Sequence, residues 1–344
     1  MPPTDSYEGG MKKNNFDFMR FMAASMVVFS HSFQVTDGSP FNSADPLYIL
    51  SHGQSTLGYL AVAIFFIMSG YLIFGSAENK KNEIGVYFWH RILRIFPALT
   101  ITVLISVILI GGILTNNADY WTQFGTYKYL LNIFLAADQS LPGVFTNNPS
   151  YWINGPLWTL KFEFVCYILA AVFAKFRFVR TSALVFFFLF LEVLFLISEN
   201  HGSVNSWIDL PRFFFAGGIF YTLKDFPFNR LTVFLSCCIA ICIFVVYGEF
   251  SFFLPIVFSY VVLTIARGDV FGNWGRYGDL SYGIYLIGWP VQQIIYVLGF
   301  HFPYENFLLS YPLVIVFAYI SWQIVEKPAL GLKNYRLRVK ENNV

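Results

Sequence analysis

Residues 18–33 read FMRFMAASMVVFSHSF, a stretch that is apolar enough for a lipid bilayer except at Arg20 and His31. These two residues lie eleven positions apart. On an α-helix that spacing is about 1100° of rotation, or three turns plus roughly 20°, so both side chains share one face about 16 Å apart. The stretch therefore predicts a membrane helix with a cation near one end and a titratable imidazole about three quarters of the way across.

The composition also indicates a membrane protein. Of the 344 residues, 56% are hydrophobic and only 12% are charged, whereas a soluble globular domain carries about 25% charged residues. The mean hydropathy is +0.57, and the net charge of +2 gives no sign of a nucleic-acid partner. Because all four cysteines lie in apolar runs, we expect small buried residues there and neither disulfides nor a metal site. They are Cys166, Cys237, Cys238 and Cys242.

Ten apolar segments are long enough to cross about 30 Å of hydrocarbon. They lie at about residues 16–35, 56–76, 92–114, 156–174, 182–198, 208–224, 231–248, 250–267, 279–299 and 307–325. A shorter segment at 126–138, TYKYLLNIFLAAD, could either cross the membrane or lie at its interface. The segment before the first span is polar, so we expect no cleaved signal peptide.

The distribution of Lys and Arg decides between the two topologies. If 126–138 crossed, the basic segment KFRFVR at 175–180 would be extracytoplasmic; if it lies at the interface, the basic loops all face the cytoplasm. The residues that this second topology places inside are Lys12, Lys13, Lys80, Lys81, Lys175, Arg177, Arg180, Lys224, Arg230, Arg267 and Arg276. We therefore predict an all-α integral membrane protein, a bundle of about ten transmembrane helices with both termini cytoplasmic.

This topology divides the chain into three parts. Residues 1–15 form a cytoplasmic N-terminal segment, 16–325 a transmembrane domain and 326–344 a basic cytoplasmic tail. The longest outside loop, 115–155, contains many Asn, Gly, Pro and aromatic residues and is expected to cap the helices.

Two ionisable residues at membrane depth predict a catalytic pair. Such residues are costly unless they pair or face water, and so they mark functional sites. Arg20 could extend to the cytoplasmic headgroups, but His31 is too deep to do so. The fourth segment, GPLWTLKFEFVCY, enters from outside and places Glu163 roughly 10 Å below the outer face, about the depth of His31. A carboxylate at that depth could orient the imidazole and raise its basicity.

Three arginines are expected near the cytoplasmic face. The segment HRILRIFP presents Arg91 and Arg94 on one face of the third helix, and Arg20 lies at the same membrane surface. Ordinary positive-inside charges explain such arginines, but three guanidinium groups also suit a ligand with several phosphates. Glu192, deep in the fifth segment, could pair with Arg212 or line the cavity, and the sequence leaves both open.

Motifs in several parts of the chain, taken in order, resemble those of one known family. RFMAASMVVFSH at 20–31 is similar to that family's motif of Arg, ten residues and His, and AIFFIMSGYLI at 63–73 to its FFxxSGFLI segment. RILR at 91–94 follows, and LWTLKFEFVCY at 157–167 is similar to the Trp-Ser-Leu-x-x-Glu block. LSYGIYLIGWP at 280–290 and VEKP at 325–328 resemble the closing segments. The chain thus resembles the integral-membrane acyltransferase-3 family.

The resemblance implies an activity and its substrates. Members of this family move acyl groups, commonly acetyl, onto carbohydrates and other acceptors, and their core has ten spans. We therefore expect acyl-CoA, most simply acetyl-CoA, as donor, with no permanently bound cofactor and no metal. The expected acceptor is an extracytoplasmic or lipid-linked glycan of surface polysaccharide, O-antigen or exopolysaccharide type, and the expected location is the bacterial inner membrane.

The same resemblance assigns roles to the residues. The three arginines would hold the nucleotide end of acyl-CoA. His31, oriented by Glu163, would act as general base on the acceptor hydroxyl, and an acyl-His intermediate stays open. Trp158 of the Trp block and Lys161 near the outer surface are candidate substrate-binding residues.

Two departures and two alternatives accompany this interpretation. Thr159 stands where the family often has Ser, and Gly288 where a His is common, which puts more weight on His31. A proton-coupled transporter or flippase could use the same His and Glu as a proton relay, and a non-catalytic membrane scaffold would need neither. The sequence also leaves a homo-oligomer open.

Overall fold

The computed structural model describes residues 13–38, 44–78, 83–175, 180–200, 205–223, 228–229, 231–236, 238 and 253–334. These residues form helices and loops without a β-strand, so the all-α prediction is confirmed for them. Five of the described helical runs are long and apolar enough to cross a membrane: Leu57–Ala77, Ile84–Leu114, Gly155–Phe173, Arg180–Ser198 and Pro303–Gly331. The helices and their composition describe a multi-pass membrane protein, while the total of ten spans stays a prediction.

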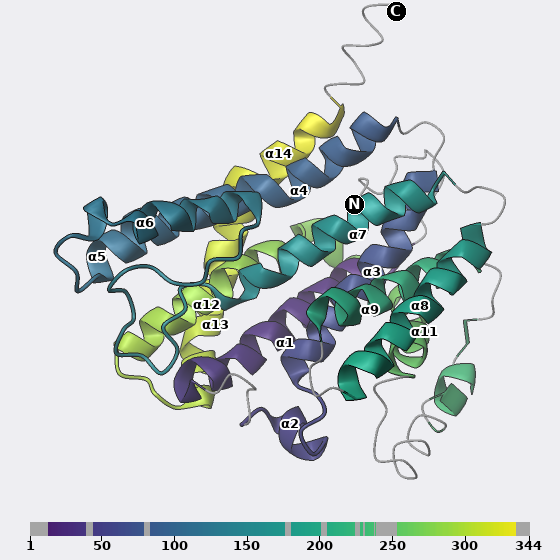
Figure 1. The fold of residues 1–344 in the computed structure, drawn as a ribbon, viewed down its shortest axis with the longest axis horizontal. Coiled ribbons are helices and arrows are strands. Elements are labelled where there is room, and N and C mark those ends of the chain that lie inside the picture. Colours follow the sequence, from purple (N-terminus) through teal and green to yellow (C-terminus); the bar gives the residue numbers. More distant parts are fainter. Residues whose placement is uncertain are drawn as a thin grey trace, which may run out of the picture. The chain divides into compact units, whose positions relative to one another are not determined.

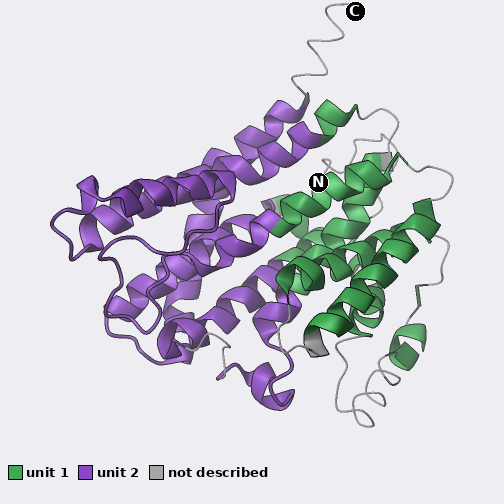
Figure 2. Ribbon diagram, viewed as in Figure 1, with its two compact units in different colours: residues 1–20, 62–87, 162–276 green, residues 21–61, 88–161, 277–344 purple. Residues whose placement is uncertain are grey.

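The chain forms two compact units, each built from segments that are far apart in the sequence (Figure 2). Unit 1 comprises residues 1–20, 62–87 and 162–276, and unit 2 comprises residues 21–61, 88–161 and 277–344. Helix α1 (Phe16–Asp37), α3 (Leu57–Glu78), α4 (Ile84–Ile105) and α7 (Leu160–Phe173) each contribute to both.

In the part of the chain that the structure describes, unit 1 also contains three long helices (Figure 1). They are α8 (Arg180–Asn200), α9 (Ser206–Thr222) and α11 (Leu254–Arg267), followed by the short η5 (Trp274–Tyr277). Helix α9 packs against both α8 and α11, and three consecutive aromatic residues of α9, Phe213–Phe215, are fully buried. The centre of this unit is therefore aromatic.

Unit 2 contains the closing helices and the long loop. Its further elements are α2 (Pro46–Leu50), π-helical η1 (Ser106–Gly111), α5 (Gly112–Leu114), η2 (Tyr120–Thr122), α6 (Phe124–Lys128), η3 (Tyr129–Phe134), η4 (Gly155–Thr159), α12 (Ser281–Val297), α13 (Pro303–Ser321), π-helical η6 (Trp322–Glu326), α14 (Lys327–Gly331) and η7 (Leu332–Asn334). Helix α12 packs along α13 (Figure 1) and also against η4. Because α12 is buried over most of its length, it is the central element of the unit.

Most predicted membrane segments coincide with described helices. Nine of the ten overlap a described helix, namely α1, α3, α4 with η1 and α5, α7, α8, α9, α11, α12 and α13. The segment 231–248 falls largely outside the described residues. The third segment begins earlier than predicted, at Ile84, because polar side chains at 90 and 91 lower the hydropathy without interrupting the backbone hydrogen bonds of the helix.

The doubtful segment 126–138 is short in the structure. Helix α6 has 5 residues and the 3₁₀ helix η3 has 6, and Leu135 in the left-handed conformation ends the run. At 1.5–2 Å per residue, eleven residues rise roughly 20 Å, less than the ~30 Å of hydrocarbon. This length agrees with the prediction that the segment does not cross.

Several residues named in the sequence-based predictions lie outside the described residues. They are Lys12, Lys80, Lys81, Arg177, Lys224, Arg230, Cys237 and Cys242, together with residues 335–344 of the predicted tail. Of the described cysteines, Cys166 and Cys238 are free thiols.

Candidate active site

The predicted site residues are distributed over both units. His31 on α1, Arg91 and Arg94 on α4, Trp158 on η4 and Lys161 on α7 belong to unit 2. Arg20 on α1 and Glu163 on α7 belong to unit 1. The pairing of His31 with Glu163 and the cluster of three arginines each draw on both units, and both stay predictions.

His31 is half-buried and packs against an indole. Its ring and the ring of Trp289 on α12 lie 4.9 Å apart and nearly perpendicular, at 75°, which is a favourable edge-to-face arrangement. Trp289 donates its Nε1–H to the carbonyl oxygen of Trp152 at 2.9 Å. This hydrogen bond fixes the indole, so Trp289 limits the orientations open to the His31 ring. The sequence analysis missed Trp289, although it directly follows Gly288 in a recognised motif.

Helix α12 also holds the backbone of α1 beside His31. The fully buried amide of Gln292 donates to the carbonyl oxygen of Val28 at 2.7 Å, and Asn306 on α13 donates to the carbonyl oxygen of Gln292 at 3.0 Å. A Cβ atom on Gly288 would lie 2.7 Å from Cγ2 of Val28. The histidine that is common in the family would therefore not fit at position 288, because Val28 of α1 lies too close to leave room for a side chain.

The buried carboxylate nearest to His31 along the chain has a structural role. Asp45 is fully buried and accepts a hydrogen bond from Ser30 Oγ at 2.5 Å. It also accepts from the backbone N–H groups of Leu47 at 2.8 Å and Leu57 at 3.2 Å. Asp45 caps α2 and fixes the loop that leads into α3. Its carboxylate oxygens therefore serve as structural hydrogen-bond acceptors.

The Trp block is attached to α12 by hydrogen bonds. Tyr285 donates to the carbonyl oxygen of Pro156 at 2.8 Å, and the Tyr285 and Thr159 hydroxyls hydrogen-bond to each other. Asn154 donates to the carbonyl oxygen of Leu286 at 2.8 Å. Thr159 therefore supplies the same hydroxyl group that the family's Ser would. These bonds fix η4, on which the half-buried Trp158 lies.

Glu163 is held by two hydroxyl groups within unit 1. Ser69 Oγ donates to Glu163 Oε1 at 3.1 Å, and the Tyr167 hydroxyl donates to the same oxygen. Tyr87 in turn donates to the carbonyl oxygen of Tyr167 at 2.9 Å. Hydrogen bonds to an ionised group are stronger than neutral ones, so this pair of donors orients the carboxylate. The i, i+4 spacing of Glu163 and Tyr167 on α7 could have indicated their contact from the sequence. Ser69 lies in another recognised motif, 94 residues away, so its contact with Glu163 has no local signal.

Close helix packing places Ser69. A Cβ atom on the adjacent Gly70 would lie 1.9 Å from the carbonyl oxygen of Phe214 on α9. The backbones of α3 and α9 meet there as closely as small residues allow, an arrangement common between membrane helices. Gly70 thereby fixes the position of α3 against α9, and with it the position from which Ser69 donates to Glu163.

The candidate phosphate-binding arginines differ in their surroundings. Arg20 forms an ion pair with Asp17 on α1 at 3.5 Å, and Arg91 is only 3% exposed. Arg94 forms an ion pair with Asp279 at 2.7 Å, and its guanidinium lies 5.7 Å from the centre of the Tyr282 ring. The sequence analysis missed Asp279, which directly precedes the LSYG segment.

Glu192 pairs with Arg212, one of the two roles that the sequence left open. Arg212 Nε and Nη2 each lie 2.9 Å from an oxygen of Glu192, and Nη1 lies 3.1 Å from Asp209. The guanidinium also stacks 3.6 Å from the centre of the Phe195 ring. Arg212 and Glu192 are each 1% exposed and Asp209 is 5% exposed. This ion-pair cluster belongs to the interior of unit 1.

Within the residues that the structure describes, no three His, Cys, Asp or Glu side chains are close enough to hold a metal ion.

Comparisons with known proteins agree with these motifs. Residues 13–326 match the family described as an acyltransferase domain. An O-acetyl transferase of Shigella phage Sf6 is 31% identical over 345 residues, covering 95% of this chain and 98% of that protein. Nodulation protein 10 of Rhizobium leguminosarum bv. viciae is 27% identical over 379 residues, covering 97% of each chain. No solved structure gives a significant match. The chain is an acyltransferase and belongs to the acyltransferase-3 family.

Proposed function

We propose that this enzyme transfers an acyl group, most simply acetyl, from cytoplasmic acyl-CoA across the membrane to a hydroxyl of an extracytoplasmic or lipid-linked carbohydrate. The observation that carries the proposal is the match along nearly the whole chain to a phage protein named as an O-acetyl transferase. That match favours an enzyme over a transporter or a scaffold. A glycan of surface polysaccharide, O-antigen or exopolysaccharide type is the proposed acceptor.

The proposed topology has ten spans, both termini in the cytoplasm and a location in the bacterial inner membrane. It divides the chain into a cytoplasmic N-terminal segment (1–15), a transmembrane acyltransferase domain (16–325) and a basic cytoplasmic tail (326–344). The short helical run at 124–134 supports it, because a crossing there would place the later basic loops outside.

Arg20, Arg91 and Arg94 are proposed to bind the phosphates of the donor at the cytoplasmic face. Phosphates cannot enter lipid without partners, and guanidinium groups bind them through two parallel hydrogen bonds. Asp279 holds the Arg94 guanidinium at 2.7 Å, which would keep that side chain ordered before the donor binds. No permanently bound cofactor is required.

His31 is proposed to act as general base. It takes the proton of the acceptor hydroxyl, whose oxygen attacks the thioester carbon and forms the new C–O bond. The C–S bond breaks, and the CoA thiolate takes the proton to leave as the free thiol. Glu163 would stabilise the imidazolium, and Trp158 with Lys161 would bind the acceptor. A two-step route through an acyl-His31 intermediate needs the same residues.

Donor binding and transfer measured side by side test the proposal. In proteoliposomes with radiolabelled acetyl-CoA, we expect His31→Ala to lower transfer about 10²–10⁴-fold while donor binding stays at the wild-type level. Arg20→Ala should weaken donor binding instead, and Glu163→Gln should behave like a milder His31→Ala. Transfer at near wild-type rate by His31→Ala would refute the assignment of the base.

A further inference from the structure

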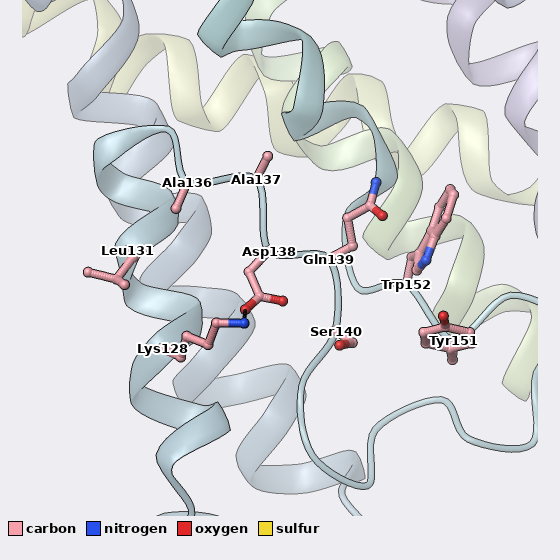
Figure 3. A pocket seen from close by; sticks show the side chains of 9 residues that line it. All are labelled: Lys128, Leu131, Ala136, Ala137, Asp138, Gln139, Ser140, Tyr151 and Trp152. Carbon is pink, nitrogen blue, oxygen red and sulfur yellow. Dashed lines mark ion pairs between the residues drawn. The ribbon is translucent and has the colours of Figure 1, made fainter. Parts of the chain in front are cut away.

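A polar cavity lies on the long loop of unit 2, outside every recognised motif. Its volume is about 340 Å³, and it is lined by Lys128 of α6, by Asp138, Gln139 and Ser140 of the following loop, and by Tyr151 and Trp152. Figure 3 shows Lys128 and Asp138 on one side and the two aromatic side chains across from them. The volume is at the lower end of the ~300–1,000 Å³ of small-molecule pockets, which suits one sugar ring.

The charges in the cavity favour an uncharged, hydroxyl-rich ligand. Lys128 Nζ lies 2.9 Å from Asp138 Oδ2, so the cation and the carboxylate balance each other. A sugar hydroxyl both donates and accepts, and this ion pair leaves two N–H donors of the ammonium beside a carboxylate that only accepts. Gln139 adds an amide with both kinds of group. An anion such as a CoA phosphate would meet the carboxylate as well as the ammonium.

The loop that carries Asp138 is held rigidly. Asn132, which is 1% exposed, donates from Nδ2 to the carbonyl oxygen of Asp138 at 2.8 Å. Its Oδ1 accepts from the Asp138 N–H at 2.7 Å. Gln139 is fixed in turn, because its carbonyl oxygen accepts from the N–H of Ile153 at 2.7 Å. The polar wall and the aromatic wall are thus joined through the backbone.

The aromatic wall leads to the predicted base. The Trp152 ring lies 5.8 Å from the Trp289 ring at an interplanar angle of 31°, and the Trp289 ring also contacts the His31 ring at 4.9 Å. All three residues belong to unit 2. Trp289 is therefore a shared neighbour of the aromatic wall of the cavity and of the predicted base.

We propose that this cavity is the subsite that binds an uncharged sugar ring of the acceptor glycan, with Trp152 and Tyr151 stacking on the ring and Asp138, Lys128 and Gln139 binding its hydroxyls. The proposal rests on the proposed function, which supplies a carbohydrate acceptor and an outside location for residues 115–155. The cavity determines which acceptor is held, while the chemistry stays with His31.

A cavity-filling substitution with a matched control tests the subsite. Ser140→Trp fills this cavity, and Thr146→Trp introduces the same side chain into a second cavity of about 460 Å³ on the same loop; both positions are exposed. The wild-type chain and each variant are produced in a bacterium that carries a surface polysaccharide. The readouts are acetyl groups on the extracted glycan and binding of radiolabelled acetyl-CoA to the purified protein.

We expect Ser140→Trp to lower glycan acetylation by on the order of 10²-fold, as misplacement of a substrate does, with donor binding unchanged. Thr146→Trp should stay within about twofold of wild type, as ordinary surface substitutions do. Equal acetylation by the two variants would overturn the subsite. A wild-type chain that acetylates no glycan while it binds acetyl-CoA would instead overturn the proposed function and the subsite with it.

A second pair of variants addresses the aromatic wall. Trp152→Ala should raise the acceptor KM about two- to tenfold, the size of one aromatic contact, and Trp152→Phe should restore most of the affinity. The backbone carbonyl of Trp152 accepts the hydrogen bonds from Trp289 and Gln293, so both substitutions leave that acceptor in place. An unchanged acceptor KM in Trp152→Ala would exclude stacking.

Discussion

Replacing Arg212 by Met should destabilise unit 1 strongly, and removing its two carboxylate partners as well should reverse most of the loss. The Arg212 guanidinium contacts Glu192 at 2.9 Å and Asp209 at 3.1 Å, and none of the three residues is more than 5% exposed. Arg212→Met leaves two buried carboxylates without the cation that both contact. Breaking a buried pair in this way costs about 3–5 kcal/mol, or about 10²–10⁴-fold in the ratio of folded to unfolded protein.

The compensated variant separates charge pairing from packing. Replacing a whole buried ion cluster by apolar or neutral residues of similar volume is often neutral. We therefore expect Glu192→Leu, Asp209→Asn and Arg212→Met together to lie within about 1–2 kcal/mol of wild type. As a matched control, Lys327→Met replaces an exposed cation and should change stability by less than about 0.5 kcal/mol.

Unfolding of the purified protein by SDS in mixed micelles, followed by the fluorescence of its 8 tryptophans, measures these differences. Equal losses in the single and the compensated variant would refute the reasoning, because the cost would then come from packing alone. Acyl transfer by the compensated variant supplies a second readout. A fully stable compensated variant without activity would show that the cluster has a role in acyl transfer besides its role in stability.

Two further predictions concern the surroundings of the site. Ser69→Ala and Tyr167→Phe each remove a hydroxyl that donates to Glu163. Each should lower kcat about ten- to hundredfold, the size of a hydrogen bond to a charged group, and leave the donor KM unchanged. A wild-type kcat in the double variant would contradict this role. Gly288→Ala forces a Cβ atom to 2.7 Å from Val28 and should cost about 1–3 kcal/mol. Val28→Ala in the same chain should recover part of that loss in the SDS titration, and no recovery would locate the strain elsewhere.

The sequence predicted the helices well because lipid restricts what a spanning segment can contain. A span needs about 20 apolar residues, and α3 and α8 follow that rule closely. The start of α4 was missed because hydropathy measures side chains, whereas the helix is required by backbone hydrogen bonds that the bilayer cannot replace. Helix α4 accordingly extends from Ile84 past Pro97, although its first two turns are polar in places.

The site was predicted only in part. Charged and titratable residues at membrane depth stand out, so His31, Glu163 and Glu192 could be named from the sequence. Arg212 was one of the two options for Glu192, but Trp289 and Ser69 could not be named, because an indole or a hydroxyl in an apolar run gives no sign of a contact far along the chain. Trp289 lies 258 residues after His31 and Ser69 lies 94 residues before Glu163.

The contacts also explain why loose motifs together specify one fold. Ser69 of the SGYLI motif donates to Glu163 of the Trp block, and Thr159 of that block hydrogen-bonds to Tyr285 of the closing segment. His31 likewise packs on Trp289 of the closing segment. Each of these motifs therefore contains a residue whose hydrogen-bond or packing partner lies in another motif. A chain that kept only one motif of such a pair would lose the contact between them.

The cavity that we assign to the acceptor lies on the loop between the RILR motif and the Trp block and uses no residue of either. Its polar wall is held by Asn132 and its aromatic wall by hydrogen bonds to α12, so its shape depends on the loop and on α12, and not on the arginines or the histidine for which we propose donor binding and proton transfer. A family with this arrangement can change its acceptor by changing the loop while keeping its chemistry, as enzymes with variable loops on a rigid scaffold do. Acceptor specificity should therefore follow substitutions at Lys128, Asp138, Gln139 and Trp152, and the acyl donor should not.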